Sequence, residues 1–321
     1  MKAGKILAAA VFASAALLSS TGVIAKTAKV AVSQIVEHPA LDATRQGLLD
    51  GLKAKGYEEG KNLEFDYKTA QGNPAIAVQI ARQFIGENPD VLVGIATPTA
   101  QALVAATRNI PVVFTAVTDP IGAKLVKQLE QPGKNVTGLS DLSPVDQHVQ
   151  LIKEILPEAK SIGVVYNPGE ANAVTLVDLL KKSAKAQGFV VVEATALKSA
   201  DVQSATQAIA AKSDVLYAPT DNTVASAIEG MIVAANQAST PVLGGATSYV
   251  EKGAIASLGF DYYQVGYQTA DYVAAILAGE KPGDLDVKIA KGSDLVVNAS
   301  AAKQLGVTIP QTVLDRATSV K

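Results

Sequence analysis

The sequence predicts an α/β protein built from two doubly wound, Rossmann-like lobes. Short runs rich in β-branched residues alternate along the chain with segments of helical periodicity. Several runs, such as Val91–Ile95, are apolar throughout, which is typical of strands in a parallel sheet covered by helices on both faces. The series of elements occurs twice within 321 residues, a length that suits about two domains.

The first series starts with a β-branched run at 29–34 and a helix over 41–55, which ends before Gly56, a residue type favoured at helix C-termini. A second helix is expected to begin at Asn73-Pro74, because asparagine caps helix N-termini and proline suits the first turn. The other elements of this half are expected as strands at 63–68, 91–95, 111–117 and 135–140 and a helix at 99–107.

The second series repeats this order in the other half of the chain. Weak local echoes support the repeat, since IATPT at 95–99 corresponds to YAPTD at 217–221, and PVVFTAV at 111–117 to PVLGGAT at 241–247. The order of the elements is the stronger signal. We expect strands at 162–166, 189–194, 215–218, 241–243 and 254–260 and helices at 144–156, 173–187, 200–211 and 224–238.

Composition excludes several classes of function. Lys+Arg number 28 and Asp+Glu number 30, so the chain lacks the positive excess of a protein that binds nucleic acid through a basic face. The sequence contains no cysteine, which excludes disulfides, thiolate metal sites and thiol nucleophiles. With only His38 and His148 present, a three-histidine metal site is impossible. We therefore expect no metal and no cofactor.

The first 25 residues have the pattern of a secretory signal peptide. Lys2 and Lys5 precede an apolar run over 6–18, and Val23-Ile24-Ala25 suits cleavage after Ala25. A membrane anchor is the alternative, but the run of about 13 residues is shorter than the roughly 20 that span a bilayer. We expect a soluble exported protein, and a compartment without ATP or NAD argues against a nucleotide-dependent enzyme.

Candidate ligand-binding residues follow the strands of both halves. In open parallel sheets, ligands bind beyond the carboxyl ends of the strands. Thr97-Pro98 and Asp119-Pro120 also resemble helix starts, whose free backbone N–H groups hold carboxylates or phosphates. The same residue types cap their own helices, so each position fits either role. The candidate ligand-binding residues are Ser33, Glu37, Thr97, Thr118, Asp119, Asp141, Asn167, Thr220, Asp221 and Asp261.

The histidines and the late aromatic residues have simpler interpretations. We expect His38 to lie in a surface loop at the edge of a cleft and His148 to be a solvated helix residue. Tyr263 and Tyr267, four residues apart, are expected to pack a helix onto its sheet, while Phe260 or a neighbouring tyrosine could flank an apolar part of a ligand. Neither histidine occurs in a hydrolase or zinc-protease motif.

Several segments resemble one known family. SQIVEHPALD at 33–42, FTAVTDP at 114–120, APTDNTVAS at 218–226 and LGFDYYQVGYQTA at 258–270 are similar to the substrate-binding proteins of ABC transporters, in their TrpX-like, tryptophan/tyrosine-type group. ATPTAQ at 96–101 and NVTGLSD at 135–141 belong to the same set. The resemblance covers nearly all of the chain after the expected signal peptide, with motifs in both halves in the right order.

This resemblance implies a clamshell of the type I periplasmic-binding-protein fold, whose two lobes close on a small solute, best supported as an aromatic amino acid. It implies a periplasmic monomer that is not an enzyme and whose partners are an ABC permease and its ATPase. The N-terminal lobe would comprise 26–140 and 258–293, and the C-terminal lobe 141–257 and 294–321. The hinge would lie near 138–143, 256–261 and 290–297.

Different residues are expected to bind the carboxylate and the ammonium group of the ligand. The carboxylate would meet hydroxyl and backbone N–H groups near Thr97 and Thr118, and the ammonium would meet Asp221 first, with Asp141 and Asp119 as the next choices. An acid is required because a buried, unpaired ammonium is costly.

Three alternatives stay open at this point. A sugar-repressor-like regulator would need a helix-turn-helix before the first lobe, where the signal pattern stands instead. A secreted hydrolase would use Ser33 or Ser140 with His38. A binding protein for a nucleoside or a sugar would have the same fold and a different ligand.

Overall fold

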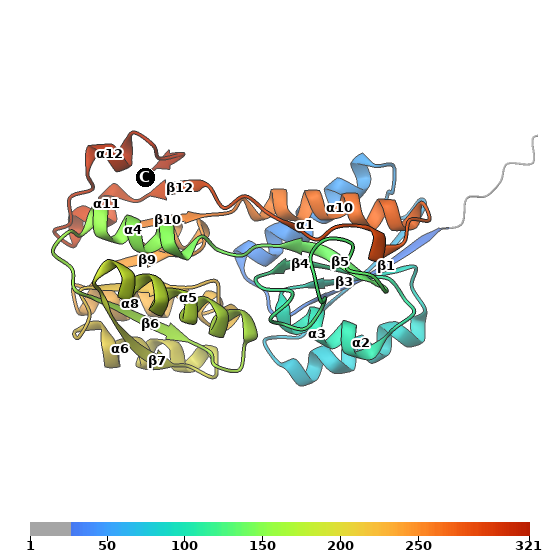
Figure 1. Ribbon diagram of the computed structural model, residues 1–321, viewed down its shortest axis with the longest axis horizontal. Helices are drawn as coiled ribbons and strands as arrows, with labels where there is room; N and C mark the ends of the chain where they lie inside the picture. Colours follow the sequence, from blue (N-terminus) through green and yellow to red (C-terminus); the bar gives the residue numbers. More distant parts are fainter. Residues whose placement is uncertain (1–26) are drawn as a thin grey trace, which may run out of the picture.

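The computed structural model describes residues 27–321, so the expected signal peptide and its cleavage site lie outside the described residues. The chain forms two α/β lobes side by side, each built around its own sheet (Figure 1). Over residues 27–321 the chain passes between the sheets after β5, after β10 and after β11. The expected fold class is confirmed.

The N-lobe contains a parallel sheet with helices on both faces (Figure 1). Among the described residues its six strands have the order β11-β5-β4-β3-β1-β2. This lobe comprises β1 (Ala28–Gln34), α1 (Pro39–Ala54), β2 (Leu63–Thr69), α2 (Pro74–Glu87), β3 (Val91–Ile95), α3 (Thr97–Ala106), β4 (Val112–Val117), β5 (Val136–Ser140), α10 (Tyr262–Leu277), the 3-10 turn η2 (Pro282–Asp284) and β11 (Lys288–Ile289).

The C-lobe repeats this plan. Its sheet has the order β13-β12-β10-β9-β8-β6-β7, and β12 runs antiparallel to β10. The lobe comprises α4 (Val145–Ile155), β6 (Ser161–Tyr166), α5 (Ala171–Gln187), β7 (Val190–Thr195), η1 (Ser199–Asp201), α6 (Val202–Ala210), β8 (Val215–Ala218), α7 (Asn222–Ala225), α8 (Ile228–Gln237), β9 (Val242–Gly244), α9 (Ser248–Glu251), β10 (Ala256–Gly259), β12 (Asp294–Val297), α11 (Ala299–Gln304), α12 (Gln311–Leu314) and β13 (Ser319–Val320).

Two sequence-based expectations about this lobe are wrong. The helix expected over 224–238 is two helices, α7 and α8. Ser226 at the break donates its hydroxyl to Thr223 O at 2.9 Å, a local bond that competes with helix continuation. His148 is fully buried rather than solvated, because its Nδ1 meets Tyr217 Oη at 2.9 Å and its Nε2 meets Leu258 O at 2.7 Å.

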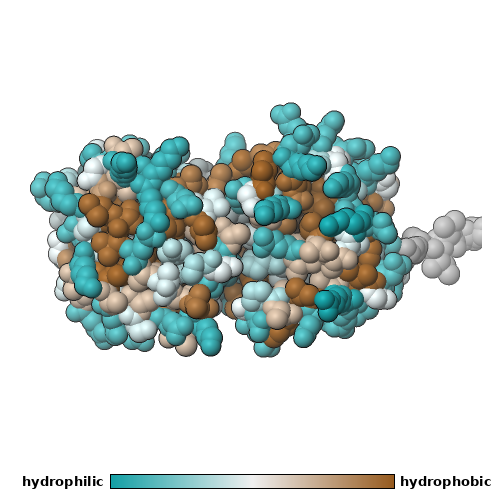
Figure 2. All heavy atoms as spheres, turned by 60° about the horizontal axis from the view of Figure 1, so that its bottom comes forward, coloured by the Kyte–Doolittle hydropathy of each residue, from teal (hydrophilic) through white to brown (hydrophobic). Residues whose placement is uncertain are grey.

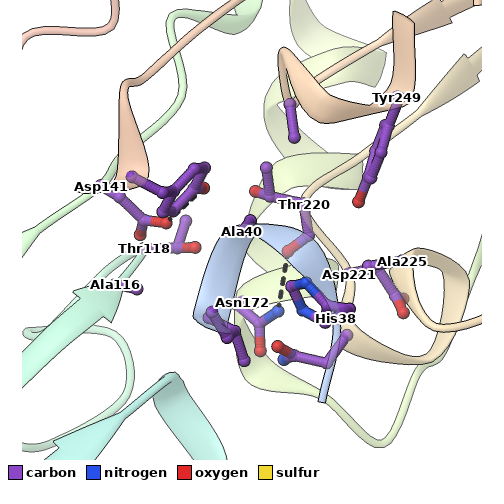
Figure 3. Close-up of a pocket in the computed structure, with 14 residues that line it drawn as sticks. His38, Ala40, Ala116, Thr118, Asp141, Asn172, Thr220, Asp221, Ala225 and Tyr249 are labelled. Carbon is purple, nitrogen blue, oxygen red and sulfur yellow. Dashed lines mark hydrogen bonds between the residues drawn. The ribbon is translucent and has the colours of Figure 1, made fainter. Parts of the chain in front are cut away.

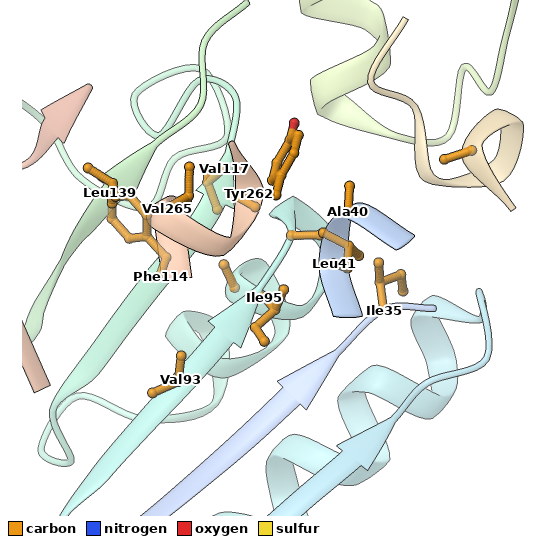
Figure 4. Close-up of a cluster of buried hydrophobic side chains, with 14 of the residues drawn as sticks. Ile35, Ala40, Leu41, Val93, Ile95, Phe114, Val117, Leu139, Tyr262 and Val265 are labelled. Carbon is orange, nitrogen blue, oxygen red and sulfur yellow. The ribbon is translucent and has the colours of Figure 1, made fainter. Parts of the chain in front are cut away.

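The core of the N-lobe reaches the gap between the lobes (Figure 4). Ile95 and Phe114 from the sheet pack with Val265 of α10 and Leu41 of α1 in one buried cluster. Tyr262, the first residue of α10, stands at the edge of this cluster with its hydroxyl pointing away from it (Figure 4). In Figure 2 the two lobes meet along the middle of the molecule. None of the helices within residues 27–321 is long and apolar enough to cross a bilayer.

Helices α1 and α10 approach each other closely through glycines, which gives a stability prediction. A Cβ on Gly266 would lie 1.8 Å from Thr44 O. We therefore expect Gly266→Ala to lower the free energy of unfolding by about 1–3 kcal/mol or more through overpacking. The control is Gly86→Ala, since a Cβ on this residue of α2 meets no described atom within 4 Å.

The control variant should gain about 0.5–1 kcal/mol, because alanine has the higher helix propensity. Denaturant unfolding of both variants checks the contrast. Equal stability of the two variants would show that α1 and α10 are not in this close contact.

Candidate ligand site between the lobes

A cavity lies between the lobes, at the carboxyl ends of the strands (Figure 3). The space between the lining atoms, counted out to the open mouth, is about 330 Å³. Both lobes line it: the N-lobe side supplies His38, Ala40, Leu41, Ala116, Thr118, Asp141 and Tyr262, and the C-lobe side supplies Asn172, Thr220, Asp221, Asn222, Ala225, Ala246 and Tyr249.

An irregular strand end brings Thr118 to this cavity. The pairing of β4 with β5 shifts register between Phe114 and Val117, and Ala116 between them has a left-handed φ of 51°. Ser140 at the end of β5 donates its hydroxyl to Thr118 O at 3.0 Å, which ties the loops after the two strands together. Thr118 and Asp141 consequently line the same part of the cavity (Figure 3).

Asp141 has an oxygen without a partner. Its Oδ2 accepts a hydrogen bond from Tyr262 Oη at 2.8 Å, whereas Oδ1 is buried and meets no donor from the part of the chain that the structure describes. Burial raises the pKa of Asp141 to about 6, and the neighbouring side chains of Tyr262 and Thr118 oppose this only in part. A buried acceptor of this kind is costly unless a ligand supplies a donor, and a cationic donor compensates the charge as well.

Asp221 is more fully bonded. It caps α7: its Oδ1 accepts from Val224 N at 2.9 Å, and its Oδ2 accepts from Asn167 N at 2.6 Å. Burial, together with the negative charge of nearby Glu170, raises the pKa of Asp221 well above its usual range. Both oxygens of Asp221 are therefore engaged in holding the loops of the C-lobe, and Asp141 is the acid that is open to a ligand.

His38 is a buried lining residue rather than the surface residue expected from the sequence. It is 9% exposed, and its Nε2 has no hydrogen-bond partner within residues 27–321. Burial lowers the pKa of His38 to about 4, and a side-chain hydrogen bond with Asn222 opposes this only in part. The imidazole is therefore neutral at pH 7. The surface expectation was wrong because His38 lines the cavity between the lobes, where it has a side-chain hydrogen bond with Asn222 of the C-lobe.

Of the ten candidate ligand-binding residues, Thr118, Asp141, Thr220 and Asp221 line the cavity. The other six do not. Asp119 accepts from Ile121 N and Gly122 N, and Asp261 accepts from Gln264 N, so each caps its own turn or helix. Glu37 is exposed and accepts a hydrogen bond from Tyr67 Oη at 3.4 Å. Asn167 donates from its Nδ2 to Thr223 Oγ1 at 2.9 Å. The hydroxyls of Ser33 and Thr97 are buried without a partner in the described chain.

Thr97 begins α3 close to the end of β4. Ala96 N donates to Thr115 O at 3.0 Å, which sets the start of α3 beside the end of β4. Ala116, the residue after Thr115, lines the cavity, whereas Thr97 is 1% exposed and does not line it.

Sequence reasoning missed several lining residues. Asn172 and Asn222 lie in the first turns of α5 and α7, and Tyr262, one of the tyrosines near Phe260, lies in the first turn of α10. Tyr249 comes from α9, five residues after β9.

The geometry gives no support to metal or serine–histidine chemistry. Residues 27–321 contain no group of three or more His, Cys, Asp or Glu side chains suited to a metal ion. Ser140 donates to Thr118 O rather than to an imidazole, and neither it nor Ser33 has a hydrogen bond with His38 in the described chain. The nucleophile–base pair that a hydrolase needs is therefore not formed.

Comparison with known proteins gives consistent results. The model of a family described as ABC transporter substrate binding protein matches residues 29–321. A curated relative from Clostridioides difficile (strain R20291), named tyrosine-binding protein, is 38% identical over 280 residues, or 87% of this chain and 81% of that protein.

Solved structures are similar over most of the chain. A conserved domain protein from Vibrio cholerae is 85% identical, with a TM-score of 0.92 over 92% of this chain and 100% of that one. An ABC domain in complex with L-Trp from Streptococcus pneumoniae is 36% identical, with a TM-score of 0.89 over 92% and 100%. A ligand-free, open substrate-binding protein from Clostridium difficile is 40% identical, with a TM-score of only 0.69 over 92% and 99%.

The TM-scores also describe the arrangement of the lobes. The sequence is slightly more similar to the open protein, yet the structure is far more similar to the L-Trp complex. The lobes described here therefore have the arrangement of the ligand-bound relative, in agreement with the buried lining of the cavity.

Proposed function

This chain belongs to the ABC transporter substrate-binding proteins, and from that premise we propose that it binds an α-amino acid with an aromatic side chain and presents it to an uptake transporter. The observation that carries the ligand class is the Oδ1 of Asp141, a buried carboxylate oxygen without a hydrogen bond in the described chain, on a residue that lines the cavity between the two lobes. An ammonium group supplies both the donor and the positive charge that this atom lacks.

The carboxylate of the ligand would lie next to its ammonium group. Hydroxyl donors for it would come from Thr118, which lines the cavity, and from Thr97, whose buried hydroxyl has no partner in the described chain. Thr97 is also the first residue of α3, a ten-residue helix whose N-terminus favours negative charge. This arrangement keeps the expected carboxylate partners and moves the ammonium from Asp221 to Asp141, because Asp221 is occupied by backbone donors.

An aromatic side chain fits the remaining lining. Leu41, Ala116, Ala225 and Ala246 are small or apolar, and Tyr249 contributes an aromatic face. The names of two relatives, one a tyrosine-binding protein and one an L-Trp complex, support the same class of ligand. No observation favours a nucleoside or a sugar over an amino acid.

The broader role follows from the family. Substrate-binding proteins of this family act outside the cytoplasm, and we propose a periplasmic, non-catalytic monomer that is released by cleavage after Ala25 and that meets a permease and its ATPase. The hinge would lie at the three passages between the sheets, near 138–143, 256–261 and 290–297.

Native mass spectrometry tests this proposal. Protein purified without a refolding step should carry a bound small molecule, because closure buries it between the lobes. The expected mass is that of an aromatic amino acid. A bound nucleotide, nucleoside or sugar would contradict the ligand class while keeping the binding-protein role.

Binding should depend on pH through Asp141. Its carboxyl has a pKa of about 6 in the ligand-free protein, and only the ionised form pairs with an ammonium group. Affinity should be constant above about pH 7 and fall roughly tenfold per pH unit below pH 6. His38, with a pKa of about 4, stays neutral through most of this range.

Calorimetry between pH 5 and pH 8 at constant ionic strength measures this profile. The raised pKa of Asp221 is a second source of titration, so Asp141→Asn is the control. A profile that keeps its slope in Asp141→Asn would assign the proton to Asp221 instead.

A further inference from the structure

The cavity contains a second unpartnered acceptor, on the side away from Asp141. Asn172 is 3% exposed, and its Oδ1 is buried without a hydrogen-bond donor in the described part of the chain. Its Nδ2 donates to Thr220 O at 3.1 Å, drawn as the dashed line in Figure 3, and to Glu170 Oε2 at 3.2 Å. Since both amide hydrogens are used within the C-lobe, the carbonyl oxygen of Asn172 is the atom left for the cavity.

Glu170 fixes this orientation of the amide. Its carboxylate is 6% exposed and accepts hydrogen bonds from Asn222 N at 3.1 Å, Asn222 Nδ2 at 2.5 Å, Thr223 N at 3.0 Å and Thr223 Oγ1 at 2.8 Å, besides Asn172. Backbone N–H groups can only donate, so the bonds from Asn222 N and Thr223 N make both carboxylate oxygens of Glu170 acceptors. The amide of Asn172 therefore cannot rotate to point its oxygen at Glu170, and the cavity is offered an acceptor rather than a donor.

The two acceptors lie at different sides of the cavity. Figure 3 shows Asp141 and Thr118 together on one side, and His38 and Asn172 on the other. Asn222 joins the second group, because it bonds both Glu170 and His38. A ligand whose ammonium is bound at Asp141 would therefore direct its side chain toward Asn172.

We propose that Asn172 Oδ1, held in place by Glu170, accepts a hydrogen bond from the ring of the ligand. This pair selects aromatic amino acids with a ring O–H or N–H, such as tyrosine and tryptophan, over phenylalanine. Asn172 contacts the ligand, and Glu170 is a positioning residue. The inference rests on the proposed function, since it needs an amino acid with its head group at Asp141.

Tyrosine and phenylalanine differ by one hydroxyl, and we expect the site to discriminate strongly between them. Phenylalanine would leave a buried carbonyl oxygen unpaired, and sites built to bond a substrate hydroxyl reject the analogue that lacks it. We expect the Kd for phenylalanine to exceed that for tyrosine by about 10- to 100-fold.

The test is the ratio of these two Kd values in wild type and in Glu170→Gln, measured by calorimetry. Glutamine can donate from its Nε2, so Thr220 O becomes the one acceptor that still holds the amide of Asn172, and Oδ1 is held less firmly toward the cavity. The ratio should fall to within about threefold of one, through weaker tyrosine binding, with the phenylalanine Kd nearly unchanged. Asn172→Ala should give the same ratio, and it keeps the other four hydrogen bonds of Glu170.

Asp214→Asn is the matched control. Asp214 accepts hydrogen bonds from Lys160 N, Ser161 N and Ser161 Oγ at 2.8–2.9 Å. It lies at the amino ends of β6 and β8 and does not line the cavity. Its variant should keep the wild-type ratio, even if stability falls. A purely structural role of Glu170 would weaken both ligands equally.

Two results would overturn the inference. One is a wild-type ratio near one, and the other is an unchanged ratio in both Glu170→Gln and Asn172→Ala. Failure of the proposed function itself is recognised separately, since wild type would then bind neither amino acid.

Discussion

Asp141→Asn should weaken binding of an aromatic amino acid by at least 30-fold. Truncating one partner of a buried, hydrogen-bonded charge pair costs on the order of 2–5 kcal/mol, and the ligand ammonium would lose its only fully available anion. Calorimetry with tryptophan and tyrosine at pH 7.5 measures the loss. Asp221→Asn and Asp119→Asn should act on the stability of the fold rather than directly on a ligand contact, because their carboxylates cap backbone N–H groups.

Asp141→Asn should not destabilise the ligand-free protein. Burial raises the pKa of Asp141 from 3.8 to about 6, so the ionised form opposes folding, and this contribution is complete above pH 6 and disappears below pH 3.8. A shift of about two units corresponds to roughly 3 kcal/mol at most. At pH 8 the ligand-free variant should thus melt at the wild-type temperature or above it.

Weaker binding without a loss of stability distinguishes a residue that binds the ligand from one that holds the fold together. A buried side chain that holds the fold together loses stability and binding together when it is replaced. Near-wild-type affinity in Asp141→Asn would exclude Asp141 as the partner of the ammonium group.

Ligand should stabilise the wild-type protein strongly. At a ligand concentration of about 1,000 times Kd, binding to the folded state alone adds about 4 kcal/mol. For a chain of this size that corresponds to a rise of about 10 °C in the melting temperature. Differential scanning fluorimetry measures the shift, and Asp141→Asn should lose most of it at the same ligand concentration.

Closure should accompany this stabilisation. The described lobes have the arrangement of the L-Trp complex rather than of the open relative, so ligand is expected to favour this compact state over an open one. Small-angle scattering should show a smaller radius of gyration with ligand. An unchanged radius together with a large thermal shift would show that the lobes are already closed in the empty protein.

Much of the fold can be predicted from the sequence because the relevant signals are local. Strands β3 and β8 have the expected bounds, since apolar β-branched runs between helices leave little freedom. The Asn73-Pro74 signal marks the start of α2, where Asn73 Oδ1 accepts from Ala75 N. His148 shows the limit, because its burial depends on Tyr217 and Leu258, far away in the sequence.

The site is less predictable for a physical reason. Asp119, Asp221 and Asp261 occupy equivalent strand-end positions, and a capping carboxylate has the same sequence signature as one that binds a ligand. Only the count of hydrogen bonds in the folded chain separates Asp141, which keeps a free oxygen. The buried state of His38 likewise arises only when the two lobes meet.

Calorimetry of the wild-type protein against a panel of solutes tests the central claim most directly. The panel comprises tryptophan, tyrosine, phenylalanine, leucine, a nucleoside and a sugar, each titrated at pH 7.5 into protein freed of any retained ligand. We predict saturable one-to-one binding of tryptophan or tyrosine, weaker binding of phenylalanine, and no heat from the nucleoside or the sugar. Tight binding of the nucleoside or the sugar, with no heat from any amino acid, would contradict the account.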